Sequence, residues 1–235
     1  MPCALITGCA KRIGKTIALN LAQQGYDIAI HYNSSLQKAQ NLQSQIQSLG
    51  QISQIYQADL NANQDILNLL PKVKADFPQL NVLINNASVF QSATLRETEL
   101  ELFYLNFNVN FKAPYFLSRD FARLCLEGNI INLLDTRVKK NNFDYSAYTL
   151  AKKALANLTQ MAALELAPDI RVNGVCPGWI LAPENATEDY LEKLRQRIPL
   201  HKQGNPEQIV KAVNYLLSNQ FVTGQLLMVN GGEHL

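Results

Sequence analysis

Short apolar runs alternate with longer amphipathic segments along this chain of 235 residues. Seven of the runs are predicted to be strands: Ala4–Thr7, Ile28–Tyr32, Ile52–Tyr56, Val82–Ile84, Ile130–Leu134, Ile170–Val175 and Leu226–Val229. Several are apolar at consecutive positions, which is typical of strands buried on both faces of a sheet. The alternation therefore predicts a doubly wound α/β fold, in which a parallel seven-stranded sheet carries helices on both faces.

The segments between the strands have the periodicity of helices. Apolar residues recur at every fourth position in two of them: Ile13, Ile17 and Leu21, and then Leu150, Ala154, Leu158 and Ala162. A long helix is also predicted over Leu100–Leu126, with Pro114 as a candidate kink. The more polar segment Ala182–Arg197 suits either a lid over a site or a surface helix. Because no repeat or linker interrupts the pattern, we expect one domain over residues 1–235.

Composition argues against several classes of protein. A net charge of +2 is too small to favour nucleic acid as a partner, and Arg137, Lys139 and Lys140 are interpreted as a solvated face. No apolar run reaches the ~20 residues that span a bilayer, and the N-terminus lacks the features of a signal peptide. The three histidines are far apart, so no metal site is expected. Four cysteines without paired spacing indicate buried thiols in a cytoplasmic protein: Cys3, Cys9, Cys125 and Cys176.

A glycine-containing turn follows the first predicted strand. The segment Thr7–Gly14 reads Thr-Gly-Cys-Ala-Lys-Arg-Ile-Gly and leads into a helix, where backbone N–H groups and the helix dipole favour a phosphate. The G-x-G-x-x-G fingerprint of many dinucleotide sites is absent. Gly14-Lys15-Thr16 is similar to the end of a P-loop, but Gly8 stands one residue too far upstream. The alternative is a β-α turn that binds no ligand.

The end of the second predicted strand bears on the choice of cofactor. NAD-binding folds place an acidic residue there for the ribose 2′-hydroxyl. Here the chain reads His31-Tyr32-Asn33-Ser34, with no carboxylate, and Arg12 is available to bind a 2′-phosphate. The pattern favours NADP over NAD.

The strongest chemical signal is Tyr148 followed by Lys152. The i, i+4 spacing puts both side chains on one face of a helix. A phenol has a pKa of about 10, and a nearby ammonium group lowers it towards neutrality. The pair is therefore expected to transfer protons.

Together with this pair, Thr7–Gly14, Asn85–Ser88, Asn110 and Pro177-Gly178 resemble the short-chain dehydrogenase/reductase family over nearly the whole chain. The resemblance implies a Rossmann-type oxidoreductase that uses NADPH, with catalytic residues Asn110, Asp135, Tyr148 and Lys152. The cofactor-binding residues that it implies are Gly8, Arg12, Ile13, Gly14, His31, Tyr32, Asn33, Ser34, Asp59, Leu60, Asn86, Ala87, Ser88, Tyr148, Lys152, Pro177 and Gly178. Asp59 has an alternative role as the N-cap of a helix over Asn61–Lys74.

Three positions depart from the common family pattern and resemble the pteridine and dihydromonapterin reductases. Arg12 replaces a glycine, Ser88 ends the Asn-Asn-Ala-Ser motif, and Asp135 stands thirteen residues before Tyr148, where the family has a serine. An ionised carboxylate accepts hydrogen bonds but cannot donate one to a ketone. It suits a substrate with ring N–H groups and C=N bonds. The alternative is that Thr136 supplies the hydroxyl.

These features predict the NADPH-dependent reduction of a pteridine C=N bond, with dihydrofolate as a further candidate whose glutamate tail would meet Arg137 and Lys139. The predicted substrate-binding residues are Arg12, Ser88, Phe90, Asp135, Tyr148 and Trp179. A carbonyl reductase, such as a 3-oxoacyl reductase, and a non-enzymatic NADP-binding regulator remain alternatives. The resemblance also implies a homotetramer built on Leu100–Leu126 and Tyr148–Leu166.

Overall fold

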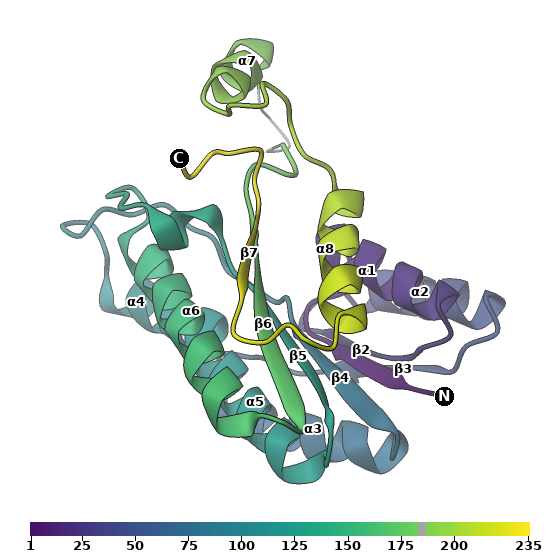
Figure 1. Ribbon diagram of the computed structural model, residues 1–235. Helices are drawn as coiled ribbons and strands as arrows, with labels where there is room; N and C mark the ends of the chain where they lie inside the picture. Colours follow the sequence, from purple (N-terminus) through teal and green to yellow (C-terminus); the bar gives the residue numbers. More distant parts are fainter. Residues whose placement is uncertain (183–186) are drawn as a thin grey trace.

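One parallel sheet organises the computed structural model, which describes residues 1–182 and 187–235 (Figure 1). Its strand order is β3-β2-β1-β4-β5-β6-β7, and every neighbouring pair is parallel. The strands are β1 Cys3–Ile6, β2 Asp27–Tyr32, β3 Ser53–Gln57, β4 Leu80–Asn85, β5 Gly128–Leu133, β6 Ile170–Pro177 and β7 Leu226–Val229. The predicted doubly wound fold is confirmed. The order reverses beside β1, and such a switch point opens a crevice at the carboxyl ends of the strands.

Helices cover both faces of the sheet. The α1, α2 and α8 helices lie on one face, and α3, α4, α5 and α6 lie on the other (Figure 1). Their bounds are α1 Arg12–Gln23, α2 Leu36–Ser48, α3 Asn63–Asp76, α4 Leu100–Phe107, α5 Ala113–Leu124, α6 Ser146–Leu166, α7 Glu188–Gln196 and α8 Pro206–Ser218. A π-helix, η1, spans Asn108–Lys112, and a 3₁₀-helix, η2, spans Thr136–Lys139.

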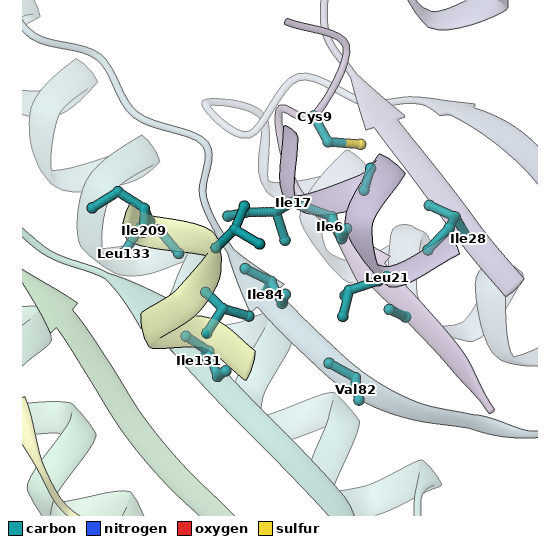
Figure 2. Packing of buried hydrophobic residues seen from close by; sticks show 14 of the residues in the cluster. Ile6, Cys9, Ile17, Leu21, Ile28, Val82, Ile84, Ile131, Leu133 and Ile209 are labelled. Carbon is teal, nitrogen blue, oxygen red and sulfur yellow. The ribbon is translucent and has the colours of Figure 1, made fainter. Parts of the chain in front are cut away.

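Two hydrophobic cores explain why the strands are apolar at consecutive positions. On β1, Ala4 and Ile6 pack into one core, whereas Cys3 and Leu5 pack into the other. Successive side chains of a strand point to opposite faces, so both must be apolar when both faces carry helices. Figure 2 shows the first core, where residues of α1 and α8 meet the strands. All four cysteines are buried and free, as predicted.

The long helix predicted over Leu100–Leu126 is interrupted by η1. Pro114, at the start of α5, has no N–H to donate to the carbonyl of Asn110 four residues earlier. The backbone N–H of Ala113 instead donates to the carbonyl of Asn108, five residues back. Such π-turns are common at functional sites, and this one contains Asn110.

The apolar stripe predicted for α6 is confirmed only in part. Ala162 is buried and Leu158 packs against a buried cluster, whereas Leu150 is 53% exposed. The buried face also runs through Tyr148, Lys152 and Leu155. The helix packs on the sheet through the face that holds its polar pair, which leaves an apolar face uncovered in the single chain. Periodicity located the helix but not its orientation.

Smaller corrections concern the ends of elements. Most predicted strands differ from the observed ones by one or two residues, as is usual at such boundaries. Asp59 is not the N-cap of α3, because this helix begins at Asn63 after Ala62. The predicted segment Ala182–Arg197 contains α7, but residues 183–186 lie outside the described part of the chain. In that described part, no helix combines the length and the hydropathy needed to cross a membrane.

Candidate active site

A cavity of about 380 Å³ lies at the carboxyl ends of β1 to β4. It brings together every residue from Gly8 to Ser88 that was predicted to bind the cofactor. Residues that the sequence analysis missed also line it: Ala10, Lys11, Ser35, Val89, Leu105 and Val109. Lys11 adds a second positive charge beside Arg12. Pro177 and Gly178 end β6 and its turn, and they are not among the lining residues.

The turn after β1 is packed too closely for larger side chains. Gly8 has a φ of +62°, which only glycine adopts without strain. A Cβ on Gly14 would lie 2.5 Å from Nδ2 of Asn86. That amide group donates hydrogen bonds to the carbonyls of Thr7 (2.8 Å) and Gly8 (3.1 Å). Asn86 thus fixes the shape of the turn, and the glycines leave its backbone accessible from the cavity.

Arg12 stands where the family has a glycine, and the backbone conformation at this position is one that favours glycine. Its φ is +56°, in the left-handed region that glycine occupies freely. Holding a non-glycine residue there costs about 1–2 kcal/mol. Arg12 also lines the cavity. Strain at such a position points to a functional side chain.

His31 supports the turn. Its ring is buried, and its Nδ1 accepts a hydrogen bond from the backbone N–H of Gly8 (2.9 Å). Its Nε2 lies 3.1 Å from the carbonyl of Ala58, to which it donates in this tautomer. Burial lowers the pKa of His31 to about 4, so the ring is neutral at pH 7. His31 therefore braces the turn against the end of β3, and its contact with the cofactor stays a prediction.

Acid should weaken the fold through His31. Between pH 6.5 and pH 4 the unfolded chain binds a proton that the folded protein rejects, so stability present above pH 6.5 falls by roughly 3 kcal/mol at pH 4. Denaturant unfolding at pH 7 and pH 4 measures this loss. It should shrink in His31→Asn and persist in His201→Asn, whose histidine is exposed. Equal losses in all three proteins would rule out this role of His31.

The cavity wall near the end of β2 suits an anion. Asn33, Ser34 and Ser35 lead into α2, and Ser35 makes no side-chain capping bond, so this helix N-terminus presents N–H groups and hydroxyls. Asp59 also lines the cavity, and its carboxylate accepts a hydrogen bond from the backbone N–H of Asn61 (2.9 Å).

Tyr148 and Asp135 form a direct pair. The phenol of Tyr148, which is buried, donates to Oδ2 of Asp135 at 2.8 Å. Burial raises the pKa of Tyr148 well above its usual value, and the Asp135 charge and hydrogen bond raise it further. The predicted lowering of this pKa by Lys152 is wrong for the free protein. The phenol is held in its protonated form, as an acid rather than a base.

Lys152 is buried behind the pair. Its Nζ donates to the carbonyl of Leu133 (2.7 Å) and lies 5.9 Å from the centroid of the Tyr148 ring. Burial lowers the pKa of Lys152 to about 8, although the Asp135 charge opposes this shift. Lys152 and Tyr148 share the buried face of α6, as the i, i+4 spacing predicts.

Asn110 connects η1 to the loop after β4. Its Oδ1 accepts hydrogen bonds from the Ser88 hydroxyl (2.9 Å) and from the backbone N–H of Val89 (3.0 Å). Its Nδ2 donates to the carbonyl of Val89 and to Oδ1 of Asn106. The side chain is fully buried. Asn110 therefore positions the wall between the cavity and the Tyr148 pair.

The structure brings Asp135, rather than Thr136, to Tyr148. Oγ1 of Thr136 accepts a hydrogen bond from Nδ2 of Asn230 at 2.6 Å, next to the C-terminus. Trp179 lines a second cavity, of about 240 Å³, and its backbone N–H donates to the Glu233 carboxylate (3.2 Å). Glu233 was not among the predicted site residues.

Two aromatic rings and an arginine stand beside Asp135. Phe90 stacks on Tyr145, with centroids 4.3 Å apart and planes 5° apart, and its ring meets that of Tyr148 edge-on at 4.7 Å. The interpretation of Arg137 as part of a solvated face is wrong. Its backbone N–H donates to Oδ1 of Asp135 at 2.8 Å, and its Nη1 lies 3.4 Å from both carboxylate oxygens.

Comparison with known proteins identifies the family. The family described as enoyl-(acyl carrier protein) reductase matches residues 8–234. The chain belongs to the short-chain dehydrogenase/reductase family.

Similar proteins differ in their activities. A 3-oxoacyl-[acyl-carrier-protein] reductase, FabG, of Staphylococcus epidermidis is 31% identical over 99% of this chain and 98% of its own length. Pteridine reductase 1 of Leishmania tarentolae is 32% identical over 100% of this chain and 96% of its own. The solved structure of FolM alternative dihydrofolate reductase 1 from Brucella canis, complexed with NADP, is 33% identical, with a TM-score of 0.93, and covers 99% of this chain and 94% of its own.

Proposed function

We propose that this protein is an NADPH-dependent reductase of the C=N bond in a dihydropterin, with dihydrofolate as a further candidate. The observation that carries the proposal is the 2.8 Å bond between the Tyr148 phenol and the Asp135 carboxylate. A serine hydroxyl at this position would donate to a carbonyl group, whereas a carboxylate accepts from N–H groups. The pteridine reductase among the relatives and the dihydrofolate reductase structure support this substrate class.

The residues that line the 380 Å³ cavity suit the pyrophosphate and the 2′-phosphate of NADP(H). The Gly8 and Gly14 turn admits a pyrophosphate to the backbone of α1, where the helix dipole favours it. Arg12, Lys11 and the N-terminus of α2 supply positive charge and N–H groups for a 2′-phosphate. The NADP bound to the Brucella canis protein supports this choice.

NADPH, when bound, supplies the hydride, and the protein supplies the proton and the alignment. Tyr148 starts as a neutral phenol and gives its proton to the ring nitrogen of the C=N bond. The phenolate that remains is then stabilised by the Lys152 ammonium, which is expected to turn towards it. Asp135 accepts from ring N–H groups and orients the substrate. Phe90 offers a partly exposed aromatic surface beside the pair.

The rate should depend on the protonation of Lys152. Because the pKa of Lys152 is about 8, we expect turnover to fall as the pH rises through that value and the ammonium is lost. A pH–rate profile from pH 6 to 10 measures this. In Lys152→Arg the fall should disappear from this range, whatever the absolute rate, because arginine stays charged. Lys153→Gln, which removes the neighbouring amine bonded to Asn141, should keep it. A profile that is flat for the wild type would exclude the role.

The substrate class is tested by NADPH oxidation with dihydromonapterin, dihydrobiopterin, dihydrofolate and acetoacetyl thioester in parallel. We expect turnover with the pterins and none, or a far slower rate, with the thioester. Turnover of the thioester alone would support the second candidate, a 3-oxoacyl reductase, which the FabG relative favours. Tight NADPH binding without any turnover would support a regulatory protein instead.

We also propose a homotetramer. In the single chain α4 and α6 leave large apolar side chains exposed, including Tyr104, Leu150, Met161 and Leu164. Exposed large apolar side chains on packed helices are typical of interaction surfaces. Light scattering should give four times the chain mass of 26.3 kDa.

A further inference from the structure

The carboxylate of Asp135 already has a side-chain partner besides Tyr148. Nη1 of Arg137 lies 3.4 Å from both of its oxygens. Tyr148 is only 5% exposed. A substrate whose N–H groups bind this carboxylate must therefore compete with Arg137.

Arg137 makes the contacts that are expected of a bound pterin: its planar group lies against aromatic rings and its N–H groups face the Asp135 carboxylate. Its guanidinium carbon lies 5.1 Å from the centroid of Phe90 and 4.9 Å from that of Tyr145. One edge of the same planar group faces both oxygens of Asp135. Aromatic rings attract a guanidinium, and a carboxylate pairs with its N–H groups.

The fit of Arg137 is incomplete. Both Nη1 distances to Asp135, at 3.4 Å, are long for charge-assisted hydrogen bonds. Its Nε is buried and finds no acceptor among the described residues. A buried donor without a partner carries a cost. These contacts are weak, so a ligand that hydrogen-bonds more closely to Asp135 displaces the guanidinium at a small cost in free energy.

We propose that Arg137 occupies, in the free protein, the place of the N–H groups by which a substrate binds Asp135, so that substrates bind by displacing it and Arg137 lowers their affinity. The ligand class for this place is a planar group with N–H donors at its edge, which a guanidinium mimics. The inference rests on the proposed function, because a pterin is a planar ring with N–H donors.

The test is binding of biopterin, which is fluorescent, to the NADP⁺-loaded protein. In Arg137→Ala and Arg137→Gln we expect biopterin to bind roughly tenfold tighter, the fold-change that the loss of one cation–π contact and one partly exposed ion pair implies. Added methylguanidinium should then compete with biopterin in Arg137→Ala at concentrations that leave the wild type unaffected, because it refills the vacated place.

Arg119 provides the matched control. Its guanidinium lies 4.6 Å from the Phe116 ring and pairs with Asp120 at 2.7 Å, on α5 and away from both cavities. Arg119→Ala should leave biopterin affinity unchanged. Equal or weaker biopterin binding in both Arg137 variants would overturn the inference and make Arg137 a substrate contact. If biopterin binds neither the variants nor the wild type, while NADP⁺ binds, the proposed function itself fails and the inference with it.

Discussion

Replacing Tyr148 with phenylalanine is expected to slow pterin reduction by about 10²–10⁴-fold while NADPH binding is retained. The phenol is the acid in the proposed step, and the substitution removes only its hydroxyl group. It is buried, protonated and 2.8 Å from Asp135. The variant keeps the aromatic ring that meets Phe90 edge-on, so the shape of the site is preserved. Single-turnover rates with saturating NADPH measure the effect on chemistry alone.

A second phenol in this chain provides the control. Tyr56 is also buried and donates to the carboxylate of Asp76 at 2.9 Å. Tyr56→Phe removes the same kind of bond outside the candidate site, so it should lower the melting temperature and leave the rate constant unchanged. If Tyr148→Phe slows the reaction no more than Tyr56→Phe does, Tyr148 is not the proton donor.

Replacing Asp135 with serine is expected to lower kcat/KM for dihydropterins by roughly 10–100-fold. This is the range for hydrogen bonds to a charged group, about 1.5–3 kcal/mol. The serine hydroxyl donates to a carbonyl oxygen, so slow reduction of acetoacetyl thioester should appear. The substrate panel applied to the variant measures both changes and reports the specificity as a ratio.

Two further variants separate charge from shape. Asp135→Asn keeps an oxygen acceptor without the charge, and pterin reduction should fall to an intermediate rate. Asp76→Ser removes the carboxylate that accepts from the Tyr56 phenol, outside the candidate site, and should not alter the specificity ratio. Pterin turnover that survives intact in Asp135→Ser would show that Asp135 does not select the substrate.

The turn at Thr7–Gly14 and the Tyr148–Lys152 pair were located from sequence because each is a local pattern. A glycine that must approach a neighbouring backbone, or two side chains one helical turn apart, is constrained by residues nearby in the chain. The cavity lining from Gly8 to Ser88 was also predictable from sequence, because these residues follow parallel strands and parallel strands bring their carboxyl ends to one edge of the sheet.

Other features depend on contacts between distant segments. Thr136 and Asp135 are adjacent in sequence, but Asp135 pairs with Tyr148 on α6 and Thr136 with Asn230 after β7. The direction of the Tyr148 pKa shift was predicted wrongly because the i, i+4 rule includes neither burial nor the Asp135 charge. The sequence predicts His31 only as a cofactor contact, and it gives no sign that the ring also joins the turns after β1 and β3.

By itself, the sequence determined the parallel doubly wound sheet, the position of the cavity at the carboxyl ends of β1 to β4 and the helix that bears Tyr148. These follow from the periodicity and spacing of neighbouring residues, which local backbone geometry converts into structure. Only the tertiary structure decided which face of α6 is buried, that the Tyr148 phenol stays protonated, and that Arg137 lies against Asp135 and Phe90. The physical reason is that the burial of a side chain and the charges around it depend on every element packed against it, and most of these elements are distant in the sequence.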